Sequence, residues 1–196
     1  ESLKLIKTDR PDMVILDLML PEMDGLEICK KIRSAQDTAL LPILMLTAKA
    51  EESDTIIGLE LGADDYVTKP FSPKVLVTRV KALFRRLERV EDPKHTSYTY
   101  GPLVVDLSRH EALVDGKETP LTAKEFGLLE QLLRHPGRVL TRDVLLNAVW
   151  GYDYYGTTRT VDVHVRRLKL KIPLLDEAII SVKSLGYKLS EQAPKK

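Results

Sequence analysis

The first ninety residues alternate short apolar runs with amphipathic segments. Continuous apolar runs occupy residues 13–18 and 43–46, and a shorter one covers 66–68. Runs without polar interruption are typical of parallel strands buried on both faces. Helical periodicity occupies the segments between and after them, namely 26–35, 51–61 and 73–89. This alternation predicts an α/β domain, with a parallel sheet and helices on both faces.

The second half follows a different pattern. Residues 98–106 and 111–113 alternate with the period of antiparallel strands, and Asp115-Gly116 is a hairpin signal. Three helical segments follow, and the first begins with the capping pattern of Thr122 and Glu125. These helices are expected at 122–135, 141–150 and 158–172, before short strands at 179–182 and 187–189. Strands, three helices and a terminal hairpin together predict an α+β winged helix.

The domain division follows from these patterns. Residues 91–97 have no periodicity and contain Asp92-Pro93, so we interpret them as a linker between a domain at 1–90 and a domain at 98–190. The tail, 191–196, is expected to be disordered. The hydrophobic fraction of 43% and the charged fraction of 30% are ordinary for a soluble globular protein. No apolar stretch approaches the length of a membrane span, so no membrane partner is expected.

The single cysteine, Cys29, excludes an internal disulfide and favours a reducing compartment such as the cytoplasm. It shares an apolar helix face with Leu26 and Ile32. We therefore interpret it as a core residue, and a reactive thiol is the less favoured alternative.

Each apolar run of the first half is followed by a polar side chain, namely Asp17, Thr47 and Lys69. The carboxyl ends of parallel strands share one edge of the sheet, where open α/β sheets bind ligands. A carboxylate can act as a nucleophile toward a phosphoryl donor, and an amine and a hydroxyl can contact the transferred oxygens. The three residues together predict a phosphoryl site. Each one alone would more commonly be a turn former or a solvated side chain.

These three residues, with the motifs Gly62-Ala63-Asp64-Asp65-Tyr66 and Lys69-Pro70-Phe71, resemble the receiver domain of a two-component response regulator. The second half resembles the winged-helix effector of the OmpR/PhoB type. The resemblance implies that a sensor histidine kinase phosphorylates Asp17 and that Lys69 contacts the phosphate. It also implies that Thr47 and Tyr66 form a switch pair, and that phosphorylation promotes a homodimer that binds promoter DNA.

The family's receiver opens with a strand that ends in acidic residues, followed by a helix and a second strand. This sequence begins with a segment that resembles the family's second helix. We therefore expect that the first strand, first helix and second strand are missing. Mg²⁺ is expected only in the complete receiver, with Asp17 and the Met19 backbone carbonyl as ligands, because the acidic pair is absent from this chain. The alternative is a degenerate receiver that never binds metal.

Charged residues near the end of the first domain match family positions that join two receivers. They are Asp64, Asp65, Arg79 and Lys81. Asp65 with Arg79 is the favoured pair across the twofold axis. The family's usual Arg and Glu are replaced by Thr55 and Val75, so one common ion pair cannot form, although surface pairs are worth only about 0–1 kcal/mol. The alternative is that these charges are simply solvated.

Positive charge is concentrated in one helix of the second domain. The segment Arg159–Lys171 carries five Lys and Arg residues against one Asp. Its apolar residues, Val161, Val165, Leu168 and Ile172, form one stripe that should face the core. The opposite, basic face fits the major groove of B-DNA, although a merely solvated basic face is the alternative.

The resemblance identifies this segment as the recognition helix. The residues that match DNA-contacting positions are Arg159, Thr160, Val163, His164, Arg166, Arg167 and Lys169 on the helix, Ser181, Lys183 and Tyr187 in the wing, and Trp150 before it. His164 could instead pack within the fold, and Trp150 should mainly be core. The residues that match the RNA polymerase contact loop are Tyr152, Asp153, Tyr154 and Tyr155.

The favoured function is therefore a phosphorylation-controlled transcription factor and not an enzyme. A phosphohydrolase of the haloacid dehalogenase type would need a second Asp two residues after the nucleophile, where this chain has Met19. The remaining alternative is a constitutive DNA-binding regulator whose receiver no longer signals.

Overall fold

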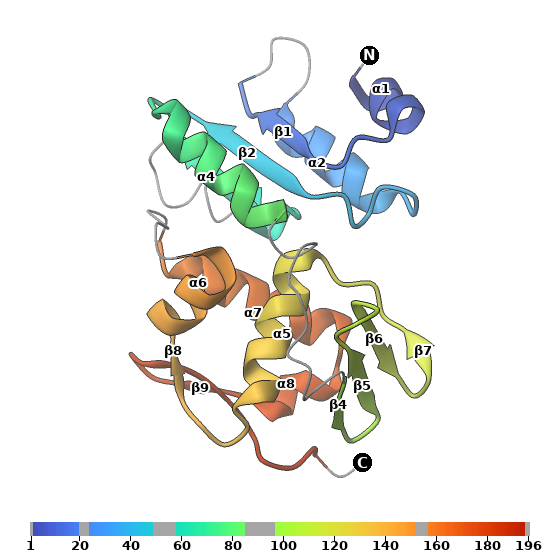
Figure 1. Ribbon diagram of the computed structural model, residues 1–196, viewed down its shortest axis with the longest axis vertical. Coiled ribbons are helices and arrows are strands. Elements are labelled where there is room, and N and C mark those ends of the chain that lie inside the picture. The colour runs from blue at the N-terminus through green and yellow to red at the C-terminus, as the bar shows by residue number, and fades with distance from the viewer. Residues whose placement is uncertain (1, 20–23, 49–57, 85–96, 152–156, 195–196) are drawn as a thin grey trace.

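The computed structural model describes residues 2–19, 24–48, 58–84, 97–151 and 157–194 (Figure 1). The chain forms an N-terminal α/β domain and a C-terminal α+β domain that contact each other. Residues 91–96 of the predicted linker, most of the predicted helix at 51–61 and the last two residues of the predicted tail lie outside the described residues. The remaining linker residue, Ser97, is described and begins the first strand of the C-terminal domain. Among the described residues, no helix combines the length and apolarity that crossing a bilayer requires.

The N-terminal domain contains a parallel sheet of three strands in the described residues. They are β1 (Val14–Asp17), β2 (Ile43–Thr47) and β3 (Asp65–Thr68), in the spatial order β1-β2-β3. Asp17 is paired in register with Leu46, and Thr47 with Thr68. The carboxyl ends of the strands therefore lie at one edge, as predicted from the apolar runs.

Helices cover the two faces of this sheet. They are α1 (Ser2–Asp9), α2 (Gly25–Ser34) and α4 (Pro73–Phe84). On one face, Cys29 and Ile32 of α2 pack with Met45 of β2, and on the other Leu83 of α4 packs with Leu44. Adjacent residues of β2 thus serve opposite faces, as the pleat of a strand requires. The prediction that Cys29 is a core residue is confirmed, because it is fully buried.

A four-stranded antiparallel sheet begins the C-terminal domain. Its strands are β4 (Ser97–Tyr100), β5 (Leu103–Asp106), β6 (Glu111–Val114) and β7 (Lys117–Glu118). The prediction of one continuous strand over 98–106 is wrong. Gly101, with a φ of +58°, and Pro102 form a turn there, and β4 pairs antiparallel with β5. Positive φ at low cost is a property of glycine, so Gly101 carried the missed signal.

The remainder of this domain contains four helices among the described residues. They are α5 (Ala123–Arg134), α6 (Arg142–Trp150), α7 (Arg159–Lys171) and the short, unpredicted α8 (Leu174–Ala178). A second sheet, in the order β8-β10-β9, is formed by β8 (Leu140–Thr141), β9 (Ile179–Val182) and β10 (Gly186–Leu189). At the start of α5, the Thr122 N–H donates to Glu125 Oε2 at 2.8 Å, which is the predicted capping contact.

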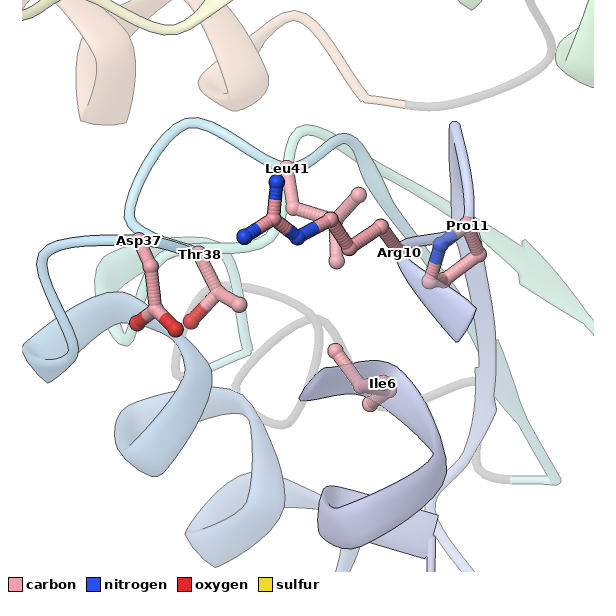
Figure 2. A pocket seen from close by; sticks show the side chains of 6 residues that line it. All are labelled: Ile6, Arg10, Pro11, Asp37, Thr38 and Leu41. Atoms are coloured by element: carbon pink, nitrogen blue, oxygen red, sulfur yellow. The ribbon is translucent and has the colours of Figure 1, made fainter. Parts of the chain in front are cut away.

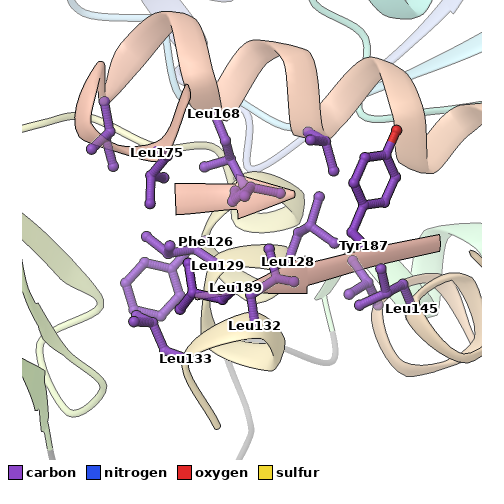
Figure 3. Close-up of a cluster of buried hydrophobic side chains, with 14 of the residues drawn as sticks. Phe126, Leu128, Leu129, Leu132, Leu133, Leu145, Leu168, Leu175, Tyr187 and Leu189 are labelled. Atoms are coloured by element: carbon purple, nitrogen blue, oxygen red, sulfur yellow. The ribbon is translucent and has the colours of Figure 1, made fainter. Parts of the chain in front are cut away.

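The core of the C-terminal domain lies between α5, α7 and the wing hairpin β9–β10 (Figure 3). Leu128, Leu129 and Leu132 of α5 contribute one side, and Leu189 of β10 another. The predicted apolar stripe of α7 is confirmed, since all four of its residues are buried here. These residues are Val161, Val165, Leu168 and Ile172.

Candidate functional site

The predicted phosphoryl site lies at the carboxyl edge of the parallel sheet. Asp17 ends β1, and the Lys69 ammonium donates directly to Asp17 Oδ2. Lys69 is held from its backbone, because its N–H donates to the Thr47 carbonyl at 2.7 Å. Asp17 Oδ1 accepts from the Met19 N–H at 3.0 Å. An acid and an amine separated by 52 residues in the chain are thus brought into contact.

The electrostatics of this edge keep Asp17 ionised. The hydrogen bond from Lys69, followed by that from the Met19 N–H, holds the pKa of the Asp17 carboxyl below its ordinary value. The Asp17 side chain is 29% exposed, so a donor can reach it. Thr47, at the end of the central strand β2, is almost fully buried beside this site.

A magnesium site is not complete in the described residues. Asp17 and the Met19 carbonyl could supply two oxygen ligands, whereas Mg²⁺ takes six in octahedral geometry. Among the described residues, no group of three or more acidic, histidine or cysteine side chains lies together. The described residues alone therefore do not fit a bound Mg²⁺.

A hollow of about 220 Å³ lies at the opposite edge of the sheet (Figure 2). It is bordered by Arg10 and Pro11, which precede β1, and by Asp37, Thr38 and Leu41, which precede β2. These residues lie at the amino ends of the strands, whereas ligands of open α/β sheets bind at the carboxyl ends. The hollow is therefore separate from the Asp17 site.

The predicted DNA-reading face of α7 is directed at the N-terminal domain. Thr160 and His164 are fully buried, and Val163 packs in the same cluster as Cys29, Met45 and Leu59. Arg159 at the start of the helix remains exposed. The prediction that the whole basic face of α7 is turned to DNA or solvent does not describe this arrangement, since the centre of that face lies in the interface between the domains.

Arginine side chains of α7 connect the two domains. Arg166 forms an ion pair with Glu60 at 2.5 Å, and both side chains are partly exposed. The Arg167 guanidinium donates to the carbonyl of Ala63 at 2.9 Å and to that of Gly62 at 3.2 Å. These contacts join residues more than one hundred positions apart in the chain.

Arg167 also belongs to a buried charge cluster inside the C-terminal domain. Its Nε lies 3.0 Å from Oε1 of Glu125, a carboxylate with no exposed surface. Lys171 Nζ lies 2.7 Å from the other oxygen of the same carboxylate. One buried acid thus fixes two cations of α7, and one of those cations also binds the other domain.

Two further contacts join the C-terminal domain to β3 and to the residue before it. The Trp150 indole N–H donates to the Asp64 carbonyl at 3.1 Å, and the indole packs edge-on against His164. The Tyr66 hydroxyl accepts a hydrogen bond from the Thr157 N–H at 3.2 Å. The predicted switch tyrosine therefore contacts the segment that leads into α7.

Comparison with known proteins agrees with both halves of this description. Residues 1–81 match the family described as "Response regulator receiver domain", and residues 116–189 match "Transcriptional regulatory protein, C terminal". The chain is 49% identical over 201 residues to the alkaline phosphatase synthesis transcriptional regulatory protein PhoP of Bacillus subtilis. That alignment covers 97% of this chain and 83% of PhoP. The chain belongs to the OmpR/PhoB family of response regulators.

Other members of the family show the same likeness. The chain is 47% identical to the sensory transduction protein RegX3 of Mycobacterium tuberculosis strain H37Rv, over 91% of this chain and 79% of RegX3. A solved structure of a cysteine-to-aspartate mutant of RitR is 28% identical, with a TM-score of 0.67 over 97% of this chain and 82% of that one. Proteins of this family are two-component response regulators that bind DNA and regulate transcription. The N-terminal domain is accordingly called the receiver below, and the C-terminal domain the winged helix.

Three of the four predicted dimer residues of the receiver are buried within this chain. Asp64 accepts from Arg33 at 2.7 Å and from the Ile43 N–H at 3.0 Å. Arg79 Nη1 lies 3.6 Å from Asp65 Oδ2, and both side chains are almost fully buried. Lys81 is exposed. The favoured pair, Asp65 with Arg79, thus exists within one chain, and its role across a dimer axis stays a prediction.

The predicted wing residues of this response regulator occupy two kinds of environment. Ser181 and Lys183 are exposed, as a DNA contact requires. Tyr187 is buried, and its hydroxyl donates to Asp162 at 2.6 Å. Burial, with this hydrogen bond, raises the pKa of Tyr187 to about 12.

Lys169, a predicted DNA-contacting residue of α7, binds within its own domain. Its ammonium forms an ion pair with the Asp176 carboxylate and donates to the Asp176 carbonyl at 2.9 Å.

The sequence did not reveal the partners of Glu60, Arg33 and Glu125. Glu60 pairs with Arg166 across the domain interface, whereas Arg33 binds within the receiver and Glu125 within the winged helix. These partners were missed because they are distant in the chain or are backbone carbonyls. A capping signal did mark Glu125, but it did not reveal the two cations. The predicted polymerase loop at 152–155 lies outside the described residues.

Proposed function

We propose that this response regulator accepts a phosphoryl group on Asp17 from a sensor histidine kinase in the cytoplasm, and that phosphorylated chains pair as dimers that bind promoter DNA through α7. The observation that carries the proposal is the contact of the Lys69 ammonium with the Asp17 carboxylate at the carboxyl edge of the sheet. The chain acts in this proposal as a regulator and not as an enzyme.

The chemistry at Asp17 is a phosphoryl transfer. A carboxylate oxygen of Asp17 forms a bond to phosphorus while the bond from phosphorus to the kinase's histidine nitrogen breaks, and the imidazole leaves. Phosphoryl transfer is supported mainly by positioned positive charge, which Lys69 supplies to the transferred oxygens. The Thr47 hydroxyl, at the end of the adjacent strand, then hydrogen-bonds a phosphate oxygen.

The DNA-binding part of the proposal rests on the chemistry of α7 and the wing. Arg159 at the start of α7 and Lys183 in the wing are exposed cations. Arginine can pair bidentately with guanine in the major groove, and cations at the margins hold phosphates. Arg166 and Arg167 can join them only when α7 is released from the receiver. The loop at 152–155 is proposed to contact RNA polymerase.

The test of phosphorylation is the uptake of a phosphoryl group from a small acyl or amido phosphate, measured by intact mass with and without added Mg²⁺. The expected result is one added phosphoryl group, which Asp17→Asn abolishes. Ser108→Asn alters a surface turn of the winged helix and serves as the matched control, which should still be phosphorylated.

A second measurement separates the signalling regulator from a constitutive DNA binder. Duplexes bound by the protein are selected from a random pool, and their affinity is measured for the untreated protein and for the phosphorylated protein. An affinity that rises on phosphorylation supports the proposal. An affinity that is the same in both states, and unchanged by Asp17→Asn, would instead identify a constitutive regulator.

A further inference from the structure

Asp162 is the single acidic residue of α7, and it lies on the side of the helix that the proposed function assigns to DNA. It follows Arg159 by three residues and precedes Arg166 by four, a spacing that places all three on one face of a helix. Its side chain is 36% exposed. Phosphates repel a carboxylate that faces a duplex, so the position of Asp162 needs a physical explanation.

Asp162 is an acceptor shared by two other elements of the winged helix. Its Oδ1 accepts from Nε of Arg142, the first residue of α6, at 2.8 Å, and from the hydroxyl of Tyr187 in β10 at 2.6 Å. Figure 3 shows the Tyr187 hydroxyl directed toward α7. The Arg142 guanidinium also lies 5.0 Å from the centre of the Tyr187 ring, within range of a cation–π contact. This seam cluster of Arg142, Asp162 and Tyr187 joins α6, α7 and the wing.

Arg142 is fixed at both its backbone and its side chain. Its N–H donates to the Leu185 carbonyl at 3.2 Å, and the preceding residue, Thr141, pairs in register with Gly186 of the wing. The bond to Asp162 uses the Nε–H, whereas the guanidinium carries further N–H donors on its terminal nitrogens. The Arg142 side chain is 22% exposed, so an anion from solvent can reach those donors.

The seam cluster lies where a bound duplex would present a phosphate backbone. Major and minor grooves alternate along a duplex, and a sugar–phosphate backbone separates them. With α7 in a major groove and the wing at the minor groove beside it, that backbone runs across the junction of α7 with β10. Arg159, one turn before Asp162, is exposed and adds a second cation, so the junction carries a net positive charge.

We propose that Arg142 binds a phosphate of this backbone through its terminal nitrogens, and that Asp162 is a positioning residue that holds Arg142 and Tyr187 for the contact. The inference rests on the proposed DNA-binding role of α7 and the wing. A guanidinium can pair bidentately with a phosphate, which sets orientation as well as affinity. An acid that holds the guanidinium in place reduces the side-chain entropy lost on binding. Asp162 thus raises the affinity for a polyanion although its own charge opposes binding.

The contact is tested with the full chain and two DNA probes, a duplex selected by the wild-type protein from a random pool and a random-sequence duplex. Arg142→Gln should weaken binding of both about tenfold, because a charge-assisted hydrogen bond is lost. The slope of log affinity against log salt should become shallower by about 0.9, the value for one phosphate. The matched control is Arg109→Gln, which removes the same charge from an exposed turn where Arg109 pairs with Glu111. It should keep the wild-type affinity and slope.

Asp162→Ala separates positioning from charge. If Asp162 acted only through its charge, its removal would raise the affinity for DNA. Positioning instead predicts a loss of about threefold for both duplexes, with the same change of salt slope as Arg142→Gln. The matched control is Asp143→Ala, which removes an exposed acid beside Arg142 and should not lower the affinity. Asp162→Asn keeps an acceptor oxygen, so its affinity should be at least that of wild type.

A double variant tests whether Asp162 acts through Arg142. In the Arg142→Gln background, Asp162→Ala should cause no further loss of affinity, because the group that it positions is already absent. Urea denaturation of each variant shows whether the winged helix remains folded. If Asp162→Ala unfolds, the comparison of Arg142→Gln with Asp162→Asn still decides the phosphate contact.

The outcomes distinguish this inference from the proposed function. Equal affinities of Arg142→Gln and Arg109→Gln for both duplexes would overturn the phosphate contact while the proposed function stands. A gain of affinity in Asp162→Ala would overturn the positioning role, and a loss confined to the selected duplex would make Asp162 a base reader instead. If the wild-type chain binds neither duplex at any concentration, the proposed DNA-binding role fails, and this inference fails with it.

Discussion

Two adjacent arginines of α7 should differ sharply in their contribution to stability. Arg166 is 67% exposed and pairs with Glu60, which is 42% exposed, whereas Arg167 is 12% exposed and pairs with Glu125, which is fully buried. Arg166→Ala removes a solvated pair, so the free energy of unfolding should fall by about 0–1 kcal/mol. Arg167→Ala leaves a buried carboxylate with one cation fewer.

The magnitude for Arg167→Ala follows from the remaining partners of Glu125. Removing one partner of a buried pair typically costs about 3–5 kcal/mol. Lys171 and the Thr122 N–H still contact Oε2 of Glu125, at 2.7 and 2.8 Å, so the charge is not left without compensation. We therefore expect a loss of about 2–3 kcal/mol, below the range for a fully isolated charge.

Urea denaturation measures this difference, with Trp150 fluorescence as the probe of the winged helix and far-ultraviolet circular dichroism as the probe of both domains together. Arg167→Lys keeps the charge but lacks the planar fork, so it should fall between wild type and Arg167→Ala. In a double-mutant cycle, Glu125→Gln should recover part of the loss caused by Arg167→Ala. Equal losses for Arg166→Ala and Arg167→Ala, within about 0.5 kcal/mol, would refute the argument from burial. Any loss of DNA binding by Arg167→Ala has to be separated from this loss of stability.

Three further predictions follow from local geometry. Gly62→Ala should destabilise the receiver by at least about 1–2 kcal/mol in thermal unfolding, because φ is +123° and the new Cβ would lie 2.4 Å from the Arg33 side chain. Gly116→Ala, with φ of +75° and no atom within 4 Å of the new Cβ, should cost less, and an equal cost would contradict the steric explanation. Burial raises the pKa of Cys29 to about 11, so the folded protein should not react with a disulfide reagent at pH 8, and full reaction should appear only after unfolding in urea. The pKa of Tyr187 is raised from 10.0 to about 12, which favours the protonated phenol in the folded state. Its contribution to stability should be complete below pH 10 and lost as pH rises toward 12, and absorbance titration of wild type against Tyr187→Phe would show a late phenol only in wild type.

The sequence by itself determined the elements that depend on local pattern. Uninterrupted apolar runs predicted β1 and β2, and polar side chains after them located Asp17, Thr47 and Lys69 at one sheet edge. The apolar stripe of α7 predicted its buried face, since the period of a helix decides which residues share a side. Where the local signal was short, at Gly101-Pro102 or in α8, the prediction of the elements was wrong or incomplete.

Only the tertiary structure decided what the opposite face of α7 contacts. The donors of a basic helix face can bind phosphates, base edges or backbone carbonyls equally well. Because every residue type has a backbone carbonyl, the sequence does not show which carbonyls act as acceptors. The partners of Arg167 in the receiver lie 104 and 105 residues away, at Ala63 and Gly62. Contacts over such separations depend on how two domains meet. The burial of His164 beneath the receiver is a consequence of that meeting.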